Sequence, residues 1–307
     1  MKRVLVTGGS GFIGRHLCRR LHAEEVDVHT VSRRALEADG VTSWCADLTD
    51  RAAVGEVFER VRPDGVFHLA SIVSGARGLD AVMPTLEGNL LTAVSVLEAA
   101  VEHQCDRVVL AGSMEEPEPS SHGAELVPVS PYAAAKLGAT TYGSMFHALY
   151  GLATVTVRLF MVYGPGQDDW AKLVPYTITS LLRGEPPQLM SGARPVDWIY
   201  VDDAVDGLLA AARATGVAGL AVDVGSGELV DVRSVVEMIA ELVHAGVDPV
   251  FDGVPDRPRE RVRTADVDRT QQLIGWSPTM PLRAGLEQTV AWYRGELANK
   301  HAAETMP

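Results

Sequence analysis

The stretch "VLVTGGSGFIGRHL", residues 4–17, passes from an apolar run through a glycine-rich turn into a helical pattern. Gly8, Gly11 and Gly14 stand between the two elements, where glycine permits a tight turn and lets backbone amides approach a bound group closely. The start of the following helix favours negative charge, so such a turn suits a pyrophosphate. Because structural turns also collect glycine, the prediction of dinucleotide binding depends on the strands and helices that come next in the chain.

Apolar β-branched runs alternate with helical patterns through the first half of the chain. Strands are expected at residues 4–7, 26–31, 65–70, 107–113 and 153–164, and helices at residues 12–22, 52–61, 88–103 and 131–150. Strands separated by helices of this length require right-handed crossovers and form a parallel sheet that is covered on both faces. The predicted fold class is therefore α/β, with a doubly wound, Rossmann-like parallel sheet.

The pattern changes after "VYGPGQ", where prolines become more frequent and the elements shorter. Amphipathic helices are expected at residues 202–214, 232–246 and 281–300. We therefore expect a dinucleotide-binding domain at residues 1–165 and a smaller C-terminal substrate-binding lobe at residues 166–307, partly interleaved with the first.

Composition limits the partners of the protein. A net charge of −13 opposes binding to nucleic acid or to an anionic membrane. No apolar run reaches the ~18 residues that span a bilayer, and no signal peptide is evident, so we expect a cytoplasmic protein. Cys18, Cys45 and Cys105 have no metal-ligand spacing. We expect buried free thiols and no metal site.

The segment "VSRR", residues 31–34, follows the second expected strand. An NAD site usually has a carboxylate here for the ribose hydroxyls, whereas Arg33 and Arg34 suit the 2′-phosphate of NADP. A solvated basic loop is the alternative. Asp47 either contacts the adenine or caps the helix at residue 52, a role that Thr49 or Asp50 fills better. NADP is the expected cofactor, and NAD is the second choice.

The segment "SPYAAAKLG" places Tyr132 and Lys136 one helical turn apart, on one face of a helix that begins near Pro131. A phenol has a pKa of ~10, and a nearby ammonium lowers it by stabilising the phenolate. Such a tyrosine can exchange a proton with an alcohol or a ketone. Ser113 ends the preceding strand, so the three residues form a candidate catalytic set.

The sequence resembles the extended short-chain dehydrogenases/reductases, which act on nucleotide sugars. The similarity lies in "TGGSGFIG", "DLTD", "VFHLAS", "EGNLLTAVSVLEAA", "GSMEE", "SPYAAAK", "RLFMVYGPGQ", "DWIYVDDAVDGLL" and "LIGWSP". The resemblance implies that Ser113 binds the reacting oxygen, Tyr132 exchanges its proton and Lys136 holds the nicotinamide ribose. The expected cofactor contacts also include Phe12, Ile13, Leu48, Leu69 and Ala70.

Substrate contacts follow the family less closely. The family commonly has Asn at Met161 and Arg at Val196, and both help to bind the nucleotide diphosphate. Arg194 and Arg257 are expected to supply positive charge instead. Arg257 matches a family arginine, whereas Arg194 is inferred from its place two positions before Val196. Trp170 either packs in the fold or lines the substrate cleft.

The resemblance leaves three reactions open at C4 of a nucleotide-activated hexose. Glu115 matches the glutamate that removes the C5 proton in family dehydratases, but Met114 replaces their acid and cannot donate a proton. NADPH-dependent 4-ketoreduction, with Glu115 orienting the substrate, is therefore preferred over 4-epimerisation and 4,6-dehydration. Glu116 is expected to face water. A dinucleotide-sensing regulator without activity is the remote alternative.

A homodimer is also implied by the resemblance. Family members commonly pair the helices that correspond to residues 88–103 and 132–150 into a four-helix bundle. The second segment carries Tyr142, Met145, Phe146 and Leu149, more apolar surface than one face on a sheet requires.

Overall fold

The computed structural model describes residues 1–33, 40–117, 127–254 and 262–305, and it divides into two compact units. The first unit consists of Met1–Leu159, Val205–Val224 and Asp266–Ser277; the second consists of Phe160–Ala204, Gly225–Ala265 and Pro278–Pro307. Within the described residues, no helix is long and apolar enough to cross a membrane. The same residues contain no group of acidic, histidine and cysteine side chains that would hold a metal ion.

The first unit is built on a seven-stranded sheet in the order β3-β2-β1-β4-β5-β6-β9, and all neighbouring strands are parallel. The strands are β1 (Arg3–Thr7), β2 (Asp27–Ser32), β3 (Val41–Cys45), β4 (Gly65–His68), β5 (Arg107–Ser113), β6 (Thr154–Leu159) and β9 (Leu220–Val224). Because β1 lies between β2 and β4, the chain reverses its direction across the sheet beside β1. This doubly wound sheet confirms the predicted fold class, and its switch point lies next to the glycine-rich turn.

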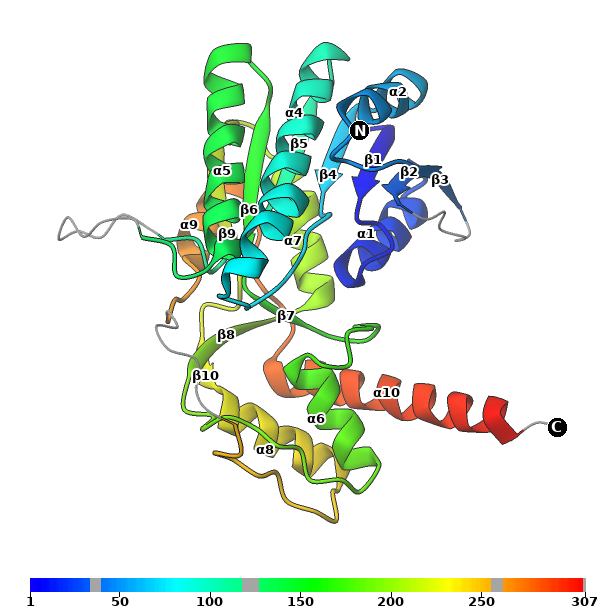
Figure 1. Cartoon of the computed structure of the whole chain (residues 1–307), viewed down its shortest axis with the longest axis vertical. Coiled ribbons are helices and arrows are strands. Elements are labelled where there is room, and N and C mark those ends of the chain that lie inside the picture. The colour runs from blue at the N-terminus through cyan, green and yellow to red at the C-terminus, as the bar shows by residue number, and fades with distance from the viewer. Residues whose placement is uncertain (34–39, 118–126, 255–261, 306–307) are drawn as a thin grey trace. The chain divides into compact units, whose positions relative to one another are not determined.

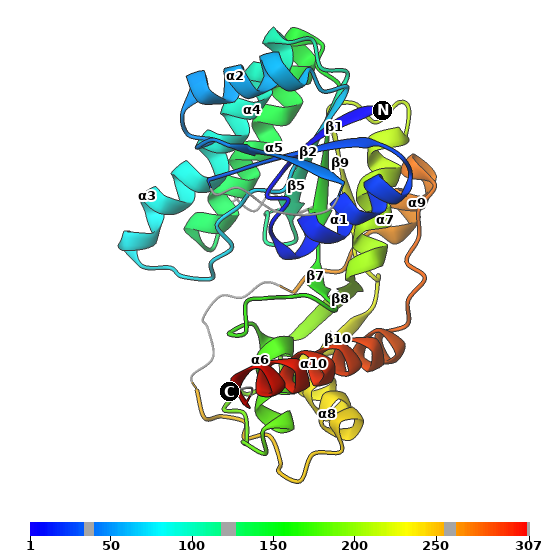
Figure 2. The same ribbon diagram turned by 90° about the vertical axis from the view of Figure 1, so that its right-hand side faces the viewer.

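Helices cover both faces of this sheet, as Figure 2 shows. The helices of the first unit are α1 (Phe12–Ala23), α2 (Arg51–Val61), α4 (Thr92–Glu102), α5 (Pro131–Tyr150), most of α7 (Val201–Arg213) and α9 (Val267–Ile274). The helices α2, α4 and α5 lie on one side. On the other side, Arg20 of α1 donates a hydrogen bond to Asp206 of α7 at 2.6 Å.

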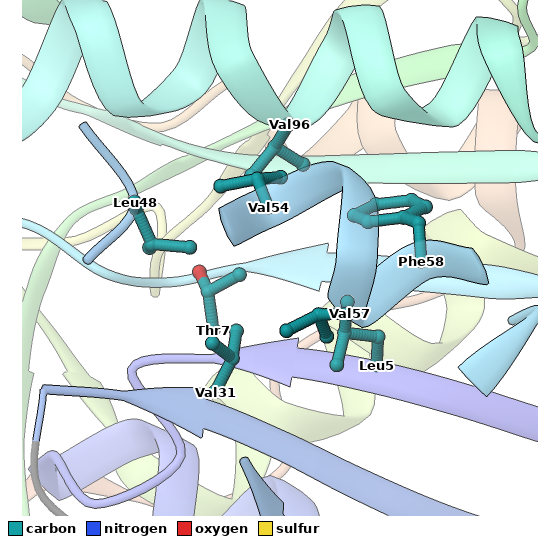
Figure 3. Close-up of a pocket in the computed structure, with 8 residues that line it drawn as sticks. All are labelled: Leu5, Thr7, Val31, Leu48, Val54, Val57, Phe58 and Val96. Atoms are coloured by element: carbon teal, nitrogen blue, oxygen red, sulfur yellow. The ribbon is translucent and has the colours of Figure 1, made fainter. Parts of the chain in front are cut away.

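The core beneath one face of the sheet holds the first βαβ unit together. Figure 3 shows Leu5, Thr7 and Val31 of the strands facing three side chains of α2 and one of α4: Val54, Val57, Phe58 and Val96. Leu48 closes the same cluster from the loop after β3. Burial of each large apolar side chain contributes about 1.5–3 kcal/mol, so this cluster fixes the strand ends that carry the glycine turn.

The expected strand at residues 153–164 is wrong in one respect, because it is two strands in two sheets. Thr154–Leu159 forms β6, which pairs with β5 and β9, whereas Met161–Tyr163 forms β7, which pairs with β8 (Pro195–Tyr200). Phe160, at the break, is buried. Because β6 is largely buried and β7 continues with apolar side chains, the apolar pattern runs through Phe160 and does not mark the change of sheet.

The second unit contains a small sheet in which β8 lies between β7 and β10 (Leu229–Asp231). Three helices of this unit, α6 (Leu173–Leu182), α8 (Val232–Val243) and α10 (Leu282–Thr305), pack against one another (Figure 1). Asp203 accepts hydrogen bonds from the backbone amides of Thr279 and Met280. This carboxylate therefore ties the chain before α10 to the first turn of α7.

The three cysteines are free thiols. Cys18 and Cys105 are buried, as expected. Cys45 is exposed, contrary to the expectation, because it ends β3 at the edge of the sheet.

Candidate active site

The glycine-rich turn joins β1 to α1 and is closely surrounded by backbone. Gly8 has φ +69°, and a Cβ at this position would lie 2.7 Å from the Ala70 amide nitrogen. The Gly11 amide donates to the Gly8 carbonyl at 3.0 Å, and Gly11 caps α1 without a side-chain hydrogen bond. The first amides of α1, which include those of Phe12 and Ile13, thus begin a helix that no side chain caps. This arrangement fits a dinucleotide pyrophosphate.

The neighbouring strand β4 ends beside the same turn. The Leu69 amide donates to the Thr7 carbonyl at 3.1 Å, and the Ala70 amide donates to the Thr7 hydroxyl at 3.1 Å. Gly14 packs directly on Gly8, where a Cβ would clash with the Gly8 carbonyl. These contacts hold the predicted cofactor residues of β1, α1 and β4 around one turn.

The loops after β2 and β3 carry the other residues predicted to contact the cofactor. Arg33 is exposed, and Arg34 lies outside the described residues. Asp47 accepts hydrogen bonds from the Thr49 amide and hydroxyl, which together with the charge of Arg33 lower its pKa. The side chain of Leu48 is buried in the core. Asp50 caps α2, as the sequence favoured, so Asp47 is not needed for that role.

The structure brings Ser113, Tyr132 and Lys136 together at the carboxyl end of β5. Ser113 is the last residue of that strand, and α5 begins at Pro131 with Ser130 as its cap. The side chains of Ser113 and Ser71 lie beside the Tyr132 hydroxyl, where they act to lower the pKa of Tyr132 against the effect of burial. The three side chains thus meet where ligands bind in doubly wound sheets.

The ionisation of Tyr132 differs from the sequence prediction. Burial raises the pKa of Tyr132 to about 12, and the charges of Glu115 and Glu116 act in the same direction. The Lys136 ammonium lies 5.8 Å from the centroid of the Tyr132 ring. Removal of the phenol from water therefore outweighs the expected lowering by lysine. In this protein, Tyr132 on its own holds its proton firmly at neutral pH.

Lys136 is buried beneath Tyr132. Its ammonium donates a hydrogen bond to the Ala111 carbonyl at 2.8 Å. Burial lowers the pKa of Lys136 to about 8, and the charge of Glu116 opposes that shift. His68 hydrogen-bonds Thr7 at 2.9 Å, and burial together with the charge of Lys136 lowers the pKa of His68 to about 3. It is a neutral core histidine, in agreement with its place in an apolar strand.

The two glutamates after Ser113 point in different directions. Glu115 is half-buried; its amide donates to the Ser113 hydroxyl at 3.2 Å, and its carboxylate accepts from the Ser130 hydroxyl at 3.3 Å. The expectation that Glu116 faces water is wrong, because its side chain is only 3% exposed. The turn after β5 folds Glu116 back under the strand end, where the Ser113 amide donates to it at 2.7 Å.

Sequence reasoning did not single out Ser71 and Asn89. The Asn89 carbonyl oxygen accepts hydrogen bonds from the Ser71 hydroxyl at 2.9 Å and the Ile72 amide at 2.6 Å. Asn89 lies in a π-helical turn, η2 (Leu86–Leu91), which precedes α4 where one continuous helix was expected. Wide turns of this kind often accompany functional sites, and this one holds the Ser71 that reaches Tyr132.

The predicted substrate residues belong to the second unit. Met161 begins β7 and Arg194 directly precedes β8; both are half-buried. Trp170 packs edge-on against Tyr293, with ring centroids 6.2 Å apart, and the Arg183 guanidinium lies 5.7 Å from its ring. Arg257 lies outside the described residues. Trp170 thus has a packing role within its unit.

Comparisons with known proteins agree with this geometry. A family model described as the NAD dependent epimerase/dehydratase family matches residues 4–225. The chain is 30% identical to the UDP-glucose 4-epimerase of Mycolicibacterium smegmatis, over 96% of this chain and 99% of that relative. It is 28% identical to the dTDP-glucose 4,6-dehydratase of Neisseria meningitidis serogroup B, over 95% and 93% of the two chains.

A solved structure shows the same fold with a cofactor. The UDP-glucose 4-epimerase of Thermus thermophilus, in complex with NAD, superposes with a TM-score of 0.85 and 29% identity. The match covers 95% of this chain and 99% of that structure.

Proposed function

The chain belongs to the NAD dependent epimerase/dehydratase family, the extended short-chain dehydrogenases/reductases, and from this premise we propose that it oxidises or reduces C4 of a nucleotide-activated hexose. One observation carries the proposal: the side chains of Ser113 and Tyr132 come together at the carboxyl end of β5, and the ammonium of the buried Lys136 lies 5.8 Å from the centroid of the Tyr132 ring. An inactive dinucleotide sensor would not need this arrangement.

Each residue of the set has a separate task in the proposed reaction. Ser113 and Tyr132 both hydrogen-bond the C4 oxygen, and Tyr132 gives a proton to that oxygen in reduction or takes it in oxidation. The glycine turn would hold the cofactor by its pyrophosphate, and the nicotinamide of that cofactor would accept or supply the hydride. The positive charge of Lys136 lies beneath Tyr132 and favours the phenolate that proton exchange requires. The proton and the hydride thus reach opposite ends of one C–O bond.

Two outcomes of this chemistry have support. Net 4-ketoreduction is favoured by Met114, a buried thioether at the position where family dehydratases carry an acid. Glu115 then orients the substrate. The 4-epimerisation of an intact hexose is supported by the Mycolicibacterium smegmatis and Thermus thermophilus relatives. A 4,6-dehydration requires an acid in place of Met114, and we place it last.

Two parallel incubations separate these outcomes. In one, the protein is supplied with a 4-keto-6-deoxy nucleotide sugar and NADPH that carries deuterium at the transferred position; in the other, it is supplied with an intact nucleotide hexose. Deuterium at C4 with one NADPH consumed per product supports 4-ketoreduction. Interconversion of the C4 epimers without net cofactor use supports epimerisation, and loss of water from an intact hexose would make Glu115 the base. If no nucleotide sugar exchanges hydride with either cofactor, the proposed function fails.

The cofactor is NAD(P), and we propose a preference for NADP. The support is Arg33, an exposed arginine at the end of β2 where NAD-binding members of this fold usually have a carboxylate. Arg34 is the second expected phosphate ligand. We also retain the division into a cofactor-binding domain, residues 1–165, and a substrate-binding lobe, residues 166–307, as part of the proposal.

A homodimer through α5 and the segment before α4 completes the proposal. Tyr142 and Leu149 on α5 are exposed, whereas Phe146 is buried against the sheet and Met145 packs beside it. The apolar surface is therefore narrower on α5 than the sequence predicts. It is extended by exposed side chains before α4, which are Leu79, Val82, Met83, Leu86 and Leu91. An apolar surface of this extent favours a partner of matching shape, such as a second copy.

A further inference from the structure

Glu116 is a buried carboxyl group beside the catalytic residues, and none of the chemistry proposed above uses it. It follows β5 by three residues, and only 3% of its surface is exposed. An ionised carboxylate is costly to bury unless hydrogen bonds and opposite charges compensate for its lost hydration. Burial indeed raises the pKa of Glu116, and its hydrogen bonds and the neighbouring cations act against that rise.

The hydrogen bonds of Glu116 join the end of β5 to α5. One carboxylate oxygen accepts from the Ser113 amide at 2.7 Å, and the other accepts from the Thr140 hydroxyl at 2.9 Å. Thr140 lies one turn after Lys136 and two turns after Tyr132, so all three share one face of α5. Glu116 therefore fixes the strand end that carries Ser113 against the helix face that carries the other catalytic residues.

The space around Glu116 depends on a glycine. A Cβ at Gly112 would lie 2.6 Å from a carboxylate oxygen of Glu116 and 2.7 Å from Cγ2 of Thr156. Such a distance is too short for a real side chain. Gly112, directly before Ser113, thus leaves room for the carboxylate beneath the strand end.

Charges of opposite sign alternate through this part of the first unit. Glu116 interacts electrostatically with Lys136 of α5 and with Arg158 of β6. The Arg158 guanidinium lies 3.3 Å from the carboxylate of Asp223 on β9. The charged groups thus form a series that runs from Asp223 through Arg158 and Glu116 to Lys136, and each carboxylate in the series lies next to a cation. Glu116 also interacts electrostatically with Tyr132.

Lys136 is the member of this series on which catalysis depends. Among the residues that the structure describes, Glu116 raises the pKa of Lys136, and His68 of β4, which is neutral, also interacts with it. Its hydrogen-bond acceptor is an uncharged carbonyl, that of Ala111. The carboxylate of Glu116 is therefore the group that compensates the charge of the buried ammonium.

We propose that Glu116 is a positioning residue of this active site, which fixes the backbone of Ser113 and holds Lys136 in its ammonium form. The inference rests on the proposed function, because its effects reach the substrate through Ser113 and Lys136. Without the carboxylate, the burial of Lys136 would favour the neutral amine, and the positive charge beneath Tyr132 would be lost at a lower pH. Loss of the Glu116 charge would by itself ease the ionisation of Tyr132, whereas loss of the ammonium would oppose it, so the titration of Lys136 is the one that reports the role of Glu116.

The substitution Glu116→Gln tests the charge alone, since an amide of the same shape still accepts from the Ser113 amide. The chain has four lysines, Lys2, Lys136, Lys172 and Lys300. Protein labelled with ¹³C at the lysine Cε therefore gives four NMR signals, and Lys136→Arg identifies the signal of Lys136. In the unsubstituted protein this signal is expected to titrate near pH 8. In Glu116→Gln its midpoint is expected to fall by on the order of one unit.

The matched control is Glu98→Gln, the same chemical change at a residue that pairs with Arg51. It should leave the midpoint of Lys136 unchanged. A second variant, Glu116→Asp, keeps the charge but shortens the reach to the Ser113 amide. Its midpoint should stay close to that of the unsubstituted protein while kcat decreases. In Glu116→Gln, the limb of the kcat pH profile that follows Lys136 should move to lower pH.

An equal Lys136 midpoint in the unsubstituted protein and in Glu116→Gln overturns the inference, as does a midpoint that falls equally in Glu98→Gln. If Glu116→Gln does not give the NMR spectrum of a folded protein, Glu116→Asp becomes the test. Because this variant keeps the carboxylate charge, a lowered Lys136 midpoint in it would refute the proposed role of Glu116. The NMR titration needs no substrate. Absence of hydride exchange therefore counts against the proposed function alone, and an unchanged midpoint counts against Glu116 alone.

Discussion

The Lys136 ammonium lies 5.8 Å from the centroid of the Tyr132 ring and hydrogen-bonds the Ala111 carbonyl. The lysine therefore faces the ring of the phenol, and Ser113 and Ser71 lie beside the hydroxyl. Because burial raises the pKa of Tyr132 to about 12, proton exchange at neutral pH needs further positive charge near the ring. The oxidised nicotinamide ring of a bound cofactor would supply such a charge.

Tyr132→Phe is expected to abolish turnover, because it removes the only proposed proton donor to the C4 oxygen. We expect kcat to decrease by about 100-fold or more, the contribution typical of general acid–base catalysis. Cofactor affinity should change little, since the lost hydroxyl is not a phosphate contact. Steady-state kinetics and calorimetric titration with the cofactor measure the two quantities. A kcat near that of the unsubstituted enzyme would remove Tyr132 from the mechanism.

Replacement of Arg33 and Arg34 together by Ala is expected to weaken NADPH binding far more than NADH binding. Each hydrogen bond between a charged group and the 2′-phosphate is worth roughly 1.5–3 kcal/mol. The Kd for NADPH should therefore rise at least about tenfold, whereas NADH lacks the phosphate that these side chains are proposed to contact. Fluorescence titration of both cofactors measures the difference. A protein that already binds NADH more tightly than NADPH contradicts the NADP assignment.

Leu149→Glu is expected to weaken the proposed homodimer. Leu149 is 67% exposed on α5, so the substitution places a charge on the surface without disturbing the core. A charge without a partner in an apolar interface is strongly unfavourable. Val262→Glu, an equivalent change at an exposed valine of the second unit, is the control and should leave the dimer intact. Light scattering at micromolar concentration reports the mass, and a monomeric unsubstituted protein would refute the dimer.

The parallel sheet was predictable because its strands are buried on both faces and alternate with helices of regular length. Local pattern was not sufficient where one apolar run serves two sheets, as at Phe160 between β6 and β7. The edge strand β3 is half-exposed, and β10 is short, so their hydrophobic pattern is weak. The sequence therefore predicts the buried central strands more reliably than the edge strand and the short strand.

The candidate site was predictable where spacing determines geometry. Tyr132 and Lys136 share a helix face by their spacing, and Ser113 ends a strand at the edge where ligands bind. The burial of Glu116 was not predictable, because it depends on a turn that reverses the chain and on the space beside Gly112. The prediction that a nearby lysine lowers the pKa of Tyr132 was wrong for a related reason, because the desolvation that raises this pKa depends on tertiary packing.

The final prediction concerns Gly8, whose conformation positions the cofactor turn. Gly8→Ala places a Cβ 2.7 Å from the Ala70 amide and requires a left-handed backbone at φ +69°. Left-handed backbone alone costs an alanine roughly 1–2 kcal/mol, and the contact adds to this because both partners are backbone. We expect a lower melting temperature and a loss of NAD(P) binding.

Gly55→Ala separates this local effect from the general effect of replacing a glycine. Gly55 lies within α2, and a Cβ there has no atom within 4 Å. Alanine favours a helix interior over glycine by about 0.5–1 kcal/mol, so this variant should melt at a higher temperature and bind the cofactor normally. Thermal melts with and without NADP measure both properties, because a ligand of the native state raises its apparent stability. If Gly8→Ala retains a stabilisation by NADP equal to that of Gly55→Ala, the turn at Gly8 does not form the pyrophosphate site.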